Sequence, residues 1–162
     1  MTEGTTTDIF DRARSIAAAA LVAAGAATII GTLLDWVTLA PPELIPADQI
    51  PRTEPFSGLD TKSAPYLLIA AGIVILAALL LVVRRKTFYA WTGFLASVVI
   101  GAIGFQNYRG LEELSYDQME RIGEPAAAIG LMLVVAGGIV GVIAGAAGAV
   151  SIPPEDRAAE TG

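Results

Sequence analysis

The chain has 162 residues, of which 54% are apolar and only 16% are charged, whereas a soluble domain normally carries about 25% charged residues. Cysteine and histidine are both absent, which excludes disulfides, thiol nucleophiles, imidazole bases and the side chains that most often bind zinc, copper or haem. The net charge of −6 argues against nucleic acid or anionic lipid as a main partner.

Four nearly uncharged stretches are each long enough to cross a bilayer, which requires about 20 apolar residues in a helix. We expect spans at residues 15–40, 65–83, 88–105 and 125–152. The predicted fold is therefore all-α, a four-transmembrane-helix bundle over residues 15–152, between polar tails at residues 1–14 and 153–162. The first stretch exceeds the 7–15 apolar residues of a signal peptide, so we expect an uncleaved helix.

The two longer connections differ in composition. Residues 41–64 contain five prolines, which disfavour helix, and we expect turns or extended backbone there, with a turn at residues 56–60 and a helix start at Ser63. In residues 106–124, apolar side chains recur at helical spacing among acidic ones, which predicts a short amphipathic helix bounded by Gly110 and Gly123. A solvated acidic connector is the alternative.

The orientation follows from the basic corner between the second and third spans. Arg84, Arg85 and Lys86 occupy the tightest connection in the chain, and short loops rich in Lys and Arg remain on the cytoplasmic side. Four crossings then place both termini in the cytoplasm and the connections at 41–64 and 106–124 outside. We expect a multi-pass protein of the plasma membrane.

Small residues are spaced for close helix contact. In lipid, helices associate through close approach at small side chains and through interhelical hydrogen bonds. We expect the small-residue stripes to pack the bundle against itself, with docking of a partner helix as the alternative. The predicted packing residues are Gly93, Ser97 and Gly101 in the third span and Gly137, Gly141 and Gly145 in the fourth, and the first span carries a similar stripe of Ala19, Ala23, Ala27 and Gly31.

Nothing in the spans predicts a reaction or a transport pathway. Ion and proton pathways normally leave ionisable groups inside the membrane, whereas the middle of these spans offers only Thr28, Ser97 and glycines. Asp35 is expected at the membrane interface, about 30 Å along the first helix. We therefore predict no catalytic residue, no metal site and no cofactor, and a protein that is not an enzyme.

Several short motifs resemble those of a known group of proteins. The first span ends in Leu34-Asp35-Trp36-Val37, Ser57-Gly58-Leu59-Asp60 precedes the second, and the last span is glycine-rich. This pattern resembles a broad group of small four-helix membrane proteins common in actinobacteria, which typically have a tryptophan at the end of the first helix, a Ser-Gly-Leu-Asp-like turn and a glycine-striped last helix. The group has no established activity, so the resemblance implies a fold and no catalytic residue.

These observations predict a non-enzymatic accessory or assembly subunit of a larger cell-envelope complex, respiratory or transport, that contacts other integral membrane proteins and lipid. The alternative is a small self-associating transporter, channel or lipid-handling protein, which would form a homo-oligomer. Large apolar side chains on the outer side are candidate partner contacts, because such anchors concentrate interface energy. They are Trp36, Phe56, Leu59, Tyr108, Leu111 and Tyr116.

Overall fold

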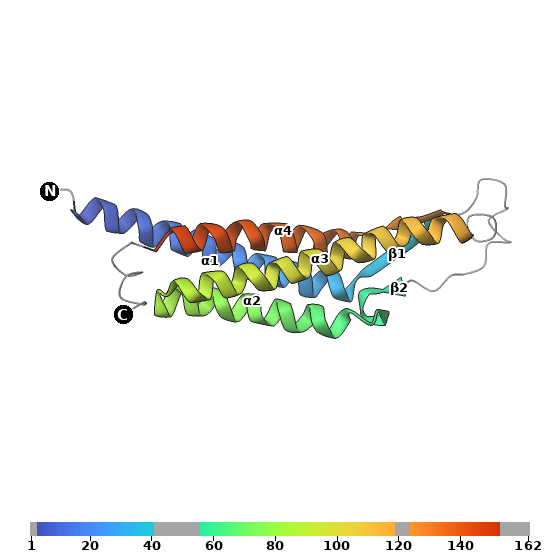
Figure 1. Cartoon of the computed structure of the whole chain (residues 1–162), viewed down its shortest axis with the longest axis horizontal. Coiled ribbons are helices and arrows are strands. Elements are labelled where there is room, and N and C mark those ends of the chain that lie inside the picture. Colours follow the sequence, from blue (N-terminus) through green and yellow to red (C-terminus); the bar gives the residue numbers. More distant parts are fainter. Residues whose placement is uncertain (1–2, 41–55, 119–123, 153–162) are drawn as a thin grey trace.

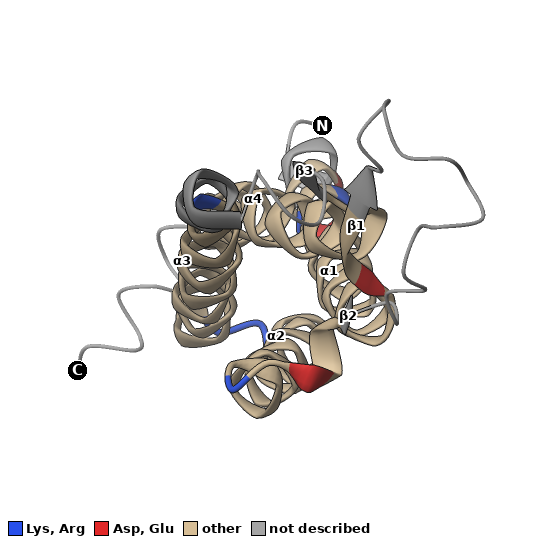
Figure 2. Ribbon diagram, turned by 90° about the vertical axis from the view of Figure 1, so that its right-hand side faces the viewer, with Lys and Arg blue, Asp and Glu red and all other residues tan. Residues whose placement is uncertain are grey.

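The computed structural model describes residues 3–40, 56–118 and 124–152. Its four long helices are α1 (Glu3–Leu33), α2 (Ala64–Arg84), α3 (Thr87–Gln118) and α4 (Ile129–Val150). They form a ring in which each helix packs on its two neighbours, α1 against α2 and α4, and α3 against α2 and α4 (Figures 1 and 2). All four are long and apolar enough to cross a membrane, so the predicted bundle of four transmembrane helices is confirmed.

The bundle has two different ends. One carries the turn from α2 to α3 at residues 84–86 and is called the corner end, and the other carries a small sheet and is called the sheet end (Figure 1). With 31 and 32 residues, α1 and α3 are about 46–48 Å long, which exceeds the ~30 Å hydrocarbon core. Their apolar spans are Asp8–Leu33 and Thr87–Leu111, so α1 projects at the corner end and α3 at the sheet end.

The sheet at the end of α1 corrects two predicted helix boundaries. The antiparallel strands β1 (Asp35–Ala40), β2 (Phe56–Ser57) and β3 (Glu124–Ala127) lie in the order β2-β1-β3. Residues 35–40 and 125–128 were predicted to belong to the first and fourth helices, but the backbone of β1 pairs with β3, from Val37 opposite Ala127 to Ala40 opposite Glu124. Aromatic and β-branched residues, which favour strands, occur in β1. Pro41 directly follows β1 and Pro125 lies within β3, and a proline disfavours helix at the residue before it.

The predicted turn before α2 is present. Gly58–Asp60 forms a 3₁₀ turn after β2, and the backbone N–H and hydroxyl of Ser57 both donate to Asp60 Oδ2, at 3.0 and 2.9 Å. Ser63 is the N-cap of α2 as expected, although its side chain makes no capping bond and its hydroxyl donates to Thr61 Oγ1 instead.

The predicted helix in the second connection is the end of α3. Residues 111–118 are helical, but α3 continues into them through Gly110 without a break, so the prediction of a separate short helix is wrong. A glycine inside a helix costs only about 1 kcal/mol relative to alanine, which does not terminate a long helix. The remainder of that segment, residues 119–123, and the proline-rich residues 41–55 lie outside the described parts of the chain.

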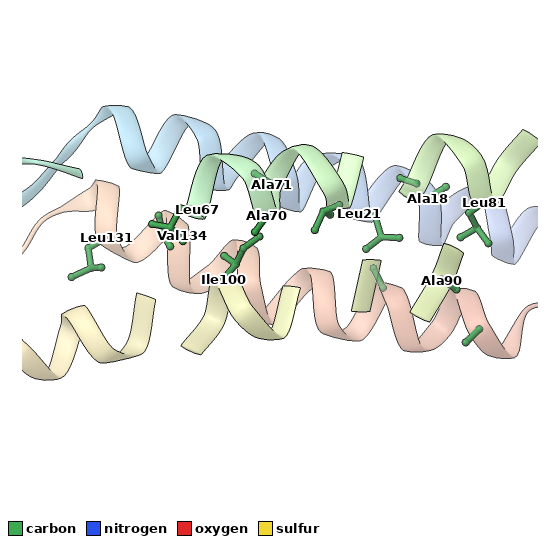
Figure 3. Close-up of a cluster of buried hydrophobic side chains, with 14 of the residues drawn as sticks. Ala18, Leu21, Leu67, Ala70, Ala71, Leu81, Ala90, Ile100, Leu131 and Val134 are labelled. Carbon is green, nitrogen blue, oxygen red and sulfur yellow. The ribbon is translucent and has the colours of Figure 1, made fainter. Parts of the chain in front are cut away.

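The core runs along the whole axis of the bundle. Large apolar side chains from all four helices point inward, and alanines fill the spaces between them (Figure 3). Leu21, Val74 and Val134 are fully buried, as in the interior of a soluble protein. The described interior is therefore filled with apolar side chains.

Trp36 closes the sheet end of this core. Only 2% of the residue is exposed, and its indole Nε1 donates to the carbonyl of Gly31 at 2.8 Å. Gly58 lies directly against the indole, and a Cβ atom at Gly58 would overlap Trp36 Nε1 and lie 2.6 Å from the carbonyl oxygen of Thr32. The Ser-Gly-Leu-Asp turn is thus held against α1 because position 58 has no side chain.

Replacing Trp36 tests this closure. Trp36→Ala leaves a cavity at the end of the core and should cost about 3–5 kcal/mol, whereas Trp36→Phe, which mainly removes the hydrogen bond, should cost about 1 kcal/mol. Thermal unfolding of the protein in detergent measures both losses. Trp91→Ala, at an exposed position on α3, is the control. If the Trp36→Ala and Trp91→Ala variants had the same melting temperature, this would contradict the role of Trp36 in closing the core.

Candidate functional site

The glycines of α4 divide between two neighbouring helices. Gly137 faces α1, where a Cβ atom on it would lie 2.7 Å from Thr28 Oγ1 and 2.9 Å from the carbonyl oxygen of Ala24. Gly130 also faces α1, where its Cβ would lie 2.7 Å from the carbonyl oxygen of Gly31. A Cβ atom essentially never lies closer than 3.0 Å to a heavy atom of another residue. Only glycine therefore fits at Gly130 and Gly137, and the backbones of α1 and α4 are in direct contact at both positions.

The other side of α4 makes equally close contacts with α3. A Cβ atom on Gly138 would lie 2.6 Å from Gly101 Cα, and one on Gly145 would lie 2.7 Å from Phe94 Cα. One on Gly141 would overlap Ser97 Oγ and lie 2.7 Å from Ser97 Cβ. The structure therefore places the glycines of α4 at contacts inside the bundle, and α4 connects α1 to α3.

Two predicted packing positions are less constrained. A Cβ atom on Gly101 would lie 3.8 Å from Gly138 Cα, which is an ordinary contact. In this pair the close approach therefore requires glycine at position 138 and not at position 101. Gly93 faces the interior, where its Cβ would lie 3.2 Å from Leu21 Cδ1 and 3.7 Å from Ala77 Cβ. Its nearest neighbours are therefore side chains of α1 and α2.

The predicted stripe on the first helix is displaced around the helix axis. Ala19 and Ala23 are exposed, whereas Ala17, Ala18 and Ala24 are buried. The prediction that Ala19 and Ala23 form a packing face inside the bundle is wrong. Alanines occur on every side of this helix, so their spacing does not identify the inward face, which is instead marked by the larger Leu21 and Thr28.

Three buried hydroxyls along the bundle are bonded within their own helices. Thr28 Oγ1 donates to the carbonyl of Ala24 at 2.9 Å, Thr32 Oγ1 to that of Thr28 at 2.8 Å, and Ser97 Oγ to that of Gly93 at 2.8 Å. A hydroxyl that bonds the carbonyl four residues earlier needs no partner across the bundle. The donors of Thr28, Thr32 and Ser97 are therefore satisfied locally.

The described residues bring together no cluster suited to metal chemistry. Among them, no three acidic side chains lie close enough to hold an ion. Asp35 lies in β1 at the sheet end and is exposed, and its interfacial position stays a prediction. The spans therefore supply packing surfaces, and charged side chains occur only at the two ends of the bundle.

The predicted partner contacts separate into three groups. Trp36 and Leu111 are 2% and 9% exposed, so their prediction as contact residues is wrong, because both complete the core. Leu59 and Tyr108 are 50% and 42% exposed and remain accessible at the sheet end. The side chains of Phe56 and Tyr116 lie outside the described part of the chain.

The sequence interpretation missed the outward face of α3. The span of α3 is the least buried of the four, and Phe88, Trp91, Leu95 and Phe105 on it are all exposed. These residues follow one another at intervals of three, four and ten residues, and ten is the sum of two steps of three and one of four, so all of them lie towards one side of the helix. That spacing was visible in the sequence, but only the packing shows that this face points away from the bundle.

No protein family, curated protein or solved structure matches this chain. The resemblance to small actinobacterial membrane proteins therefore stays a prediction. The four apolar helices by themselves indicate the class, a multi-pass membrane protein.

A substitution at Gly141 tests the contact between α3 and α4. Gly141→Ala places a methyl group into Ser97 and should cost about 1–3 kcal/mol, and Gly141→Leu should disrupt the helix packing altogether. Thermal stability and monodispersity in detergent report the loss. Gly72→Ala is the matched control, because nothing lies within 4 Å of a Cβ atom there. Wild-type stability of the Gly141→Leu variant would contradict the assignment.

Proposed function

We propose that this chain is a non-enzymatic accessory or assembly subunit of a larger complex in the cell envelope, respiratory or transport. The observation that carries the proposal is the uncovered face of α3, which has Phe88, Trp91, Leu95 and Phe105 exposed on the least buried span. Aromatic side chains are frequent anchors of protein interfaces, because they bury a large area at a low cost in side-chain entropy.

The arrangement inside the bundle supports a role at its surface. The core is apolar, its central hydroxyls are bonded within their own helices, and the α4 glycines are occupied by α1 and α3. A partner helix would therefore meet a different face from the glycine stripe. The outward faces of the helices and the sheet end remain for such contacts.

The sheet end extends the same surface beyond the membrane span. Asn107 Nδ2 lies 3.4 Å from Ser63 Oγ, which places the start of α2 beside the part of α3 that carries Tyr108. Leu59, just before α2, is exposed at the same end. We propose Leu59 and Tyr108 as partner contacts that continue the α3 face.

Self-association is the second candidate function. Because the core of one chain is filled with side chains, a passage or groove for a hydrophobic cargo would have to form between copies. Such a cargo requires no charge inside the membrane. The same α3 face would then meet a second copy, giving a small transporter, channel or lipid-handling assembly. Native mass spectrometry separates the two functions, because a homo-oligomer supports this one and a hetero-complex supports the first.

We further propose that the protein lies in the plasma membrane with its corner end in the cytoplasm. Arg85 Nη2 lies 3.8 Å from Asp11 Oδ2, so the start of α1 and the basic corner share one end. Gly148, near the end of α4, also lies beside Ala17 and Leu81. Short basic connections are retained on the cytoplasmic side, which would place both tails there.

Single cysteines test this orientation, because the natural chain contains none. Lys86→Cys lies at the corner end and Lys62→Cys at the sheet end, and both positions are exposed. A membrane-impermeant maleimide applied to intact cells should label the Lys62→Cys variant, and should label the Lys86→Cys variant only after the membrane is opened. The reverse pattern would overturn the proposed orientation.

Purification from native membranes in a mild detergent tests the proposed function. The wild-type chain should be recovered with stoichiometric partner proteins. A Trp91→Ala/Phe105→Ala variant, altered on the outward face of α3, should lose most of them. The matched control is Leu76→Ala/Leu79→Ala on the exposed face of α2, which should retain them.

Two results would count against a partner-binding role for α3. One is recovery of the wild-type chain alone as a monomer. The other is an equal loss of partners in the α2 and α3 variants, which would indicate a general loss of stability and not a specific contact. Melting temperatures of both variants equal to that of the wild type would exclude a general loss of stability.

A further inference from the structure

We propose that the corner end binds the headgroup phosphate of an anionic phospholipid, with Arg85 and Lys86 as its main contacts. The proposal is independent of a protein partner, since it concerns the ends of the helices and not their apolar faces. It follows from the burial of Arg14, from an ion pair that holds Asp11, and from the position of the basic corner at the end of the α2 span.

The exposed charge of the corner is positive. Arg84, Arg85 and Lys86 are consecutive and exposed, and Figure 2 shows this basic corner between α2 and α3 at the far end of the bundle. Arg12 and Asp8 are both exposed on α1 at the same end, so the exposed basic residues outnumber the exposed acidic one among the described residues there. The whole chain is negative, but a bound headgroup responds to charges within about one Debye length, roughly 8 Å at physiological salt.

The acidic group closest to this corner is held by another residue. Asp11 Oδ1 accepts a bond from Arg14 Nη2 at 2.6 Å, whereas Asp11 Oδ2 lies 3.8 Å from Arg85 Nη2. Because the shorter pair is the stronger one, Asp11 mainly neutralises Arg14. The side chain of Arg85 is 59% exposed, so its guanidinium group stays available to pair with an external anion.

Arg14 is a buried cation at the same end whose hydrogen bonding is incomplete among the described residues. Its side chain is 6% exposed, and its Nε donor has no hydrogen-bond partner within the described residues. A buried guanidinium with an unsatisfied donor is costly. A phosphate oxygen at the neighbouring corner would lower that cost by adding negative charge to a region of low dielectric constant.

The backbone at Arg85 has an unusual conformation. Arg85 ends α2 in the left-handed conformation, with φ 54° and ψ 31°, and it is the one described non-glycine residue with positive φ. Glycine is the usual residue at such a position, so an arginine there is held at a conformational cost. The turn presents Arg85 and Lys86 together at the end of the bundle.

The position of the corner along the membrane normal also fits a headgroup. The span of α2 ends at Arg84 after 21 residues, about 31 Å at 1.5 Å per residue, which matches the thickness of the hydrocarbon core. Phe88 and Trp91 are exposed in the first and second turns of α3, and aromatic residues typically mark the membrane interface. The corner therefore lies at the depth of the lipid phosphates.

Native mass spectrometry of the full chain tests the proposal, with phosphatidylglycerol and phosphatidylcholine of equal acyl chains titrated in detergent. Phosphatidylglycerol should bind more tightly. Arg85→Gln/Lys86→Gln should weaken its binding about fivefold for each charge removed. Asp11→Asn should strengthen binding, because it removes the carboxylate that competes for Arg14 and Arg85.

The control is Lys62→Gln/Arg109→Gln, which removes the same charge from exposed positions at the sheet end and should leave binding unchanged. Equal weakening in both double variants would overturn the proposal, as would equal affinity for the two lipids. The chain could also bind phosphatidylglycerol selectively only after residues 153–162 are deleted. That result would show that the acidic tail pairs with the corner in the full chain, and it would also overturn the proposal. None of these outcomes depends on whether a protein partner exists.

Discussion

Backbone contact between α4 and its two neighbours is the interaction on which this structure depends. Within lipid, apolar side chains gain little by leaving the hydrocarbon for a helix interface, so association requires close approach. Gly137 provides it towards α1, and Gly138, Gly141 and Gly145 provide it towards α3. The ring is closed by α2, whose buried Leu67, Val74 and Leu81 fill the remaining space.

The same packing gives the described interior its largely apolar character. Glycine and alanine supply contact without donors or acceptors, and the hydroxyls of Thr28, Thr32 and Ser97 are bonded within their own helices. Specific interaction is then left to the outside of the molecule. The aromatic face of α3 is suited to an apolar partner, and the basic corner is suited to an anionic headgroup, and these two surfaces can act independently.

Several features of the fold followed from local sequence patterns, and several did not. The spans were predictable because length and hydropathy are properties of each segment by itself. The strand at residues 35–40 was not, because it follows an apolar helix directly and its partner, β3, lies about 90 residues away in the chain. The burial of Trp36 depends on Gly58, and the displaced face of α1 depends on which neighbours surround it.

The sequence alone therefore determined the class of the protein, the number of crossings and the small residues available for close contact. Only the tertiary structure decided which neighbour each glycine meets, which aromatic residues close the core and which face outward. The physical reason is that insertion into a bilayer depends on the composition of one helix at a time, whereas packing depends on the shape of surfaces brought together from distant parts of the chain. Leu111 and Tyr108 illustrate this, since both are apolar or aromatic residues near the end of α3, yet one is buried and the other exposed.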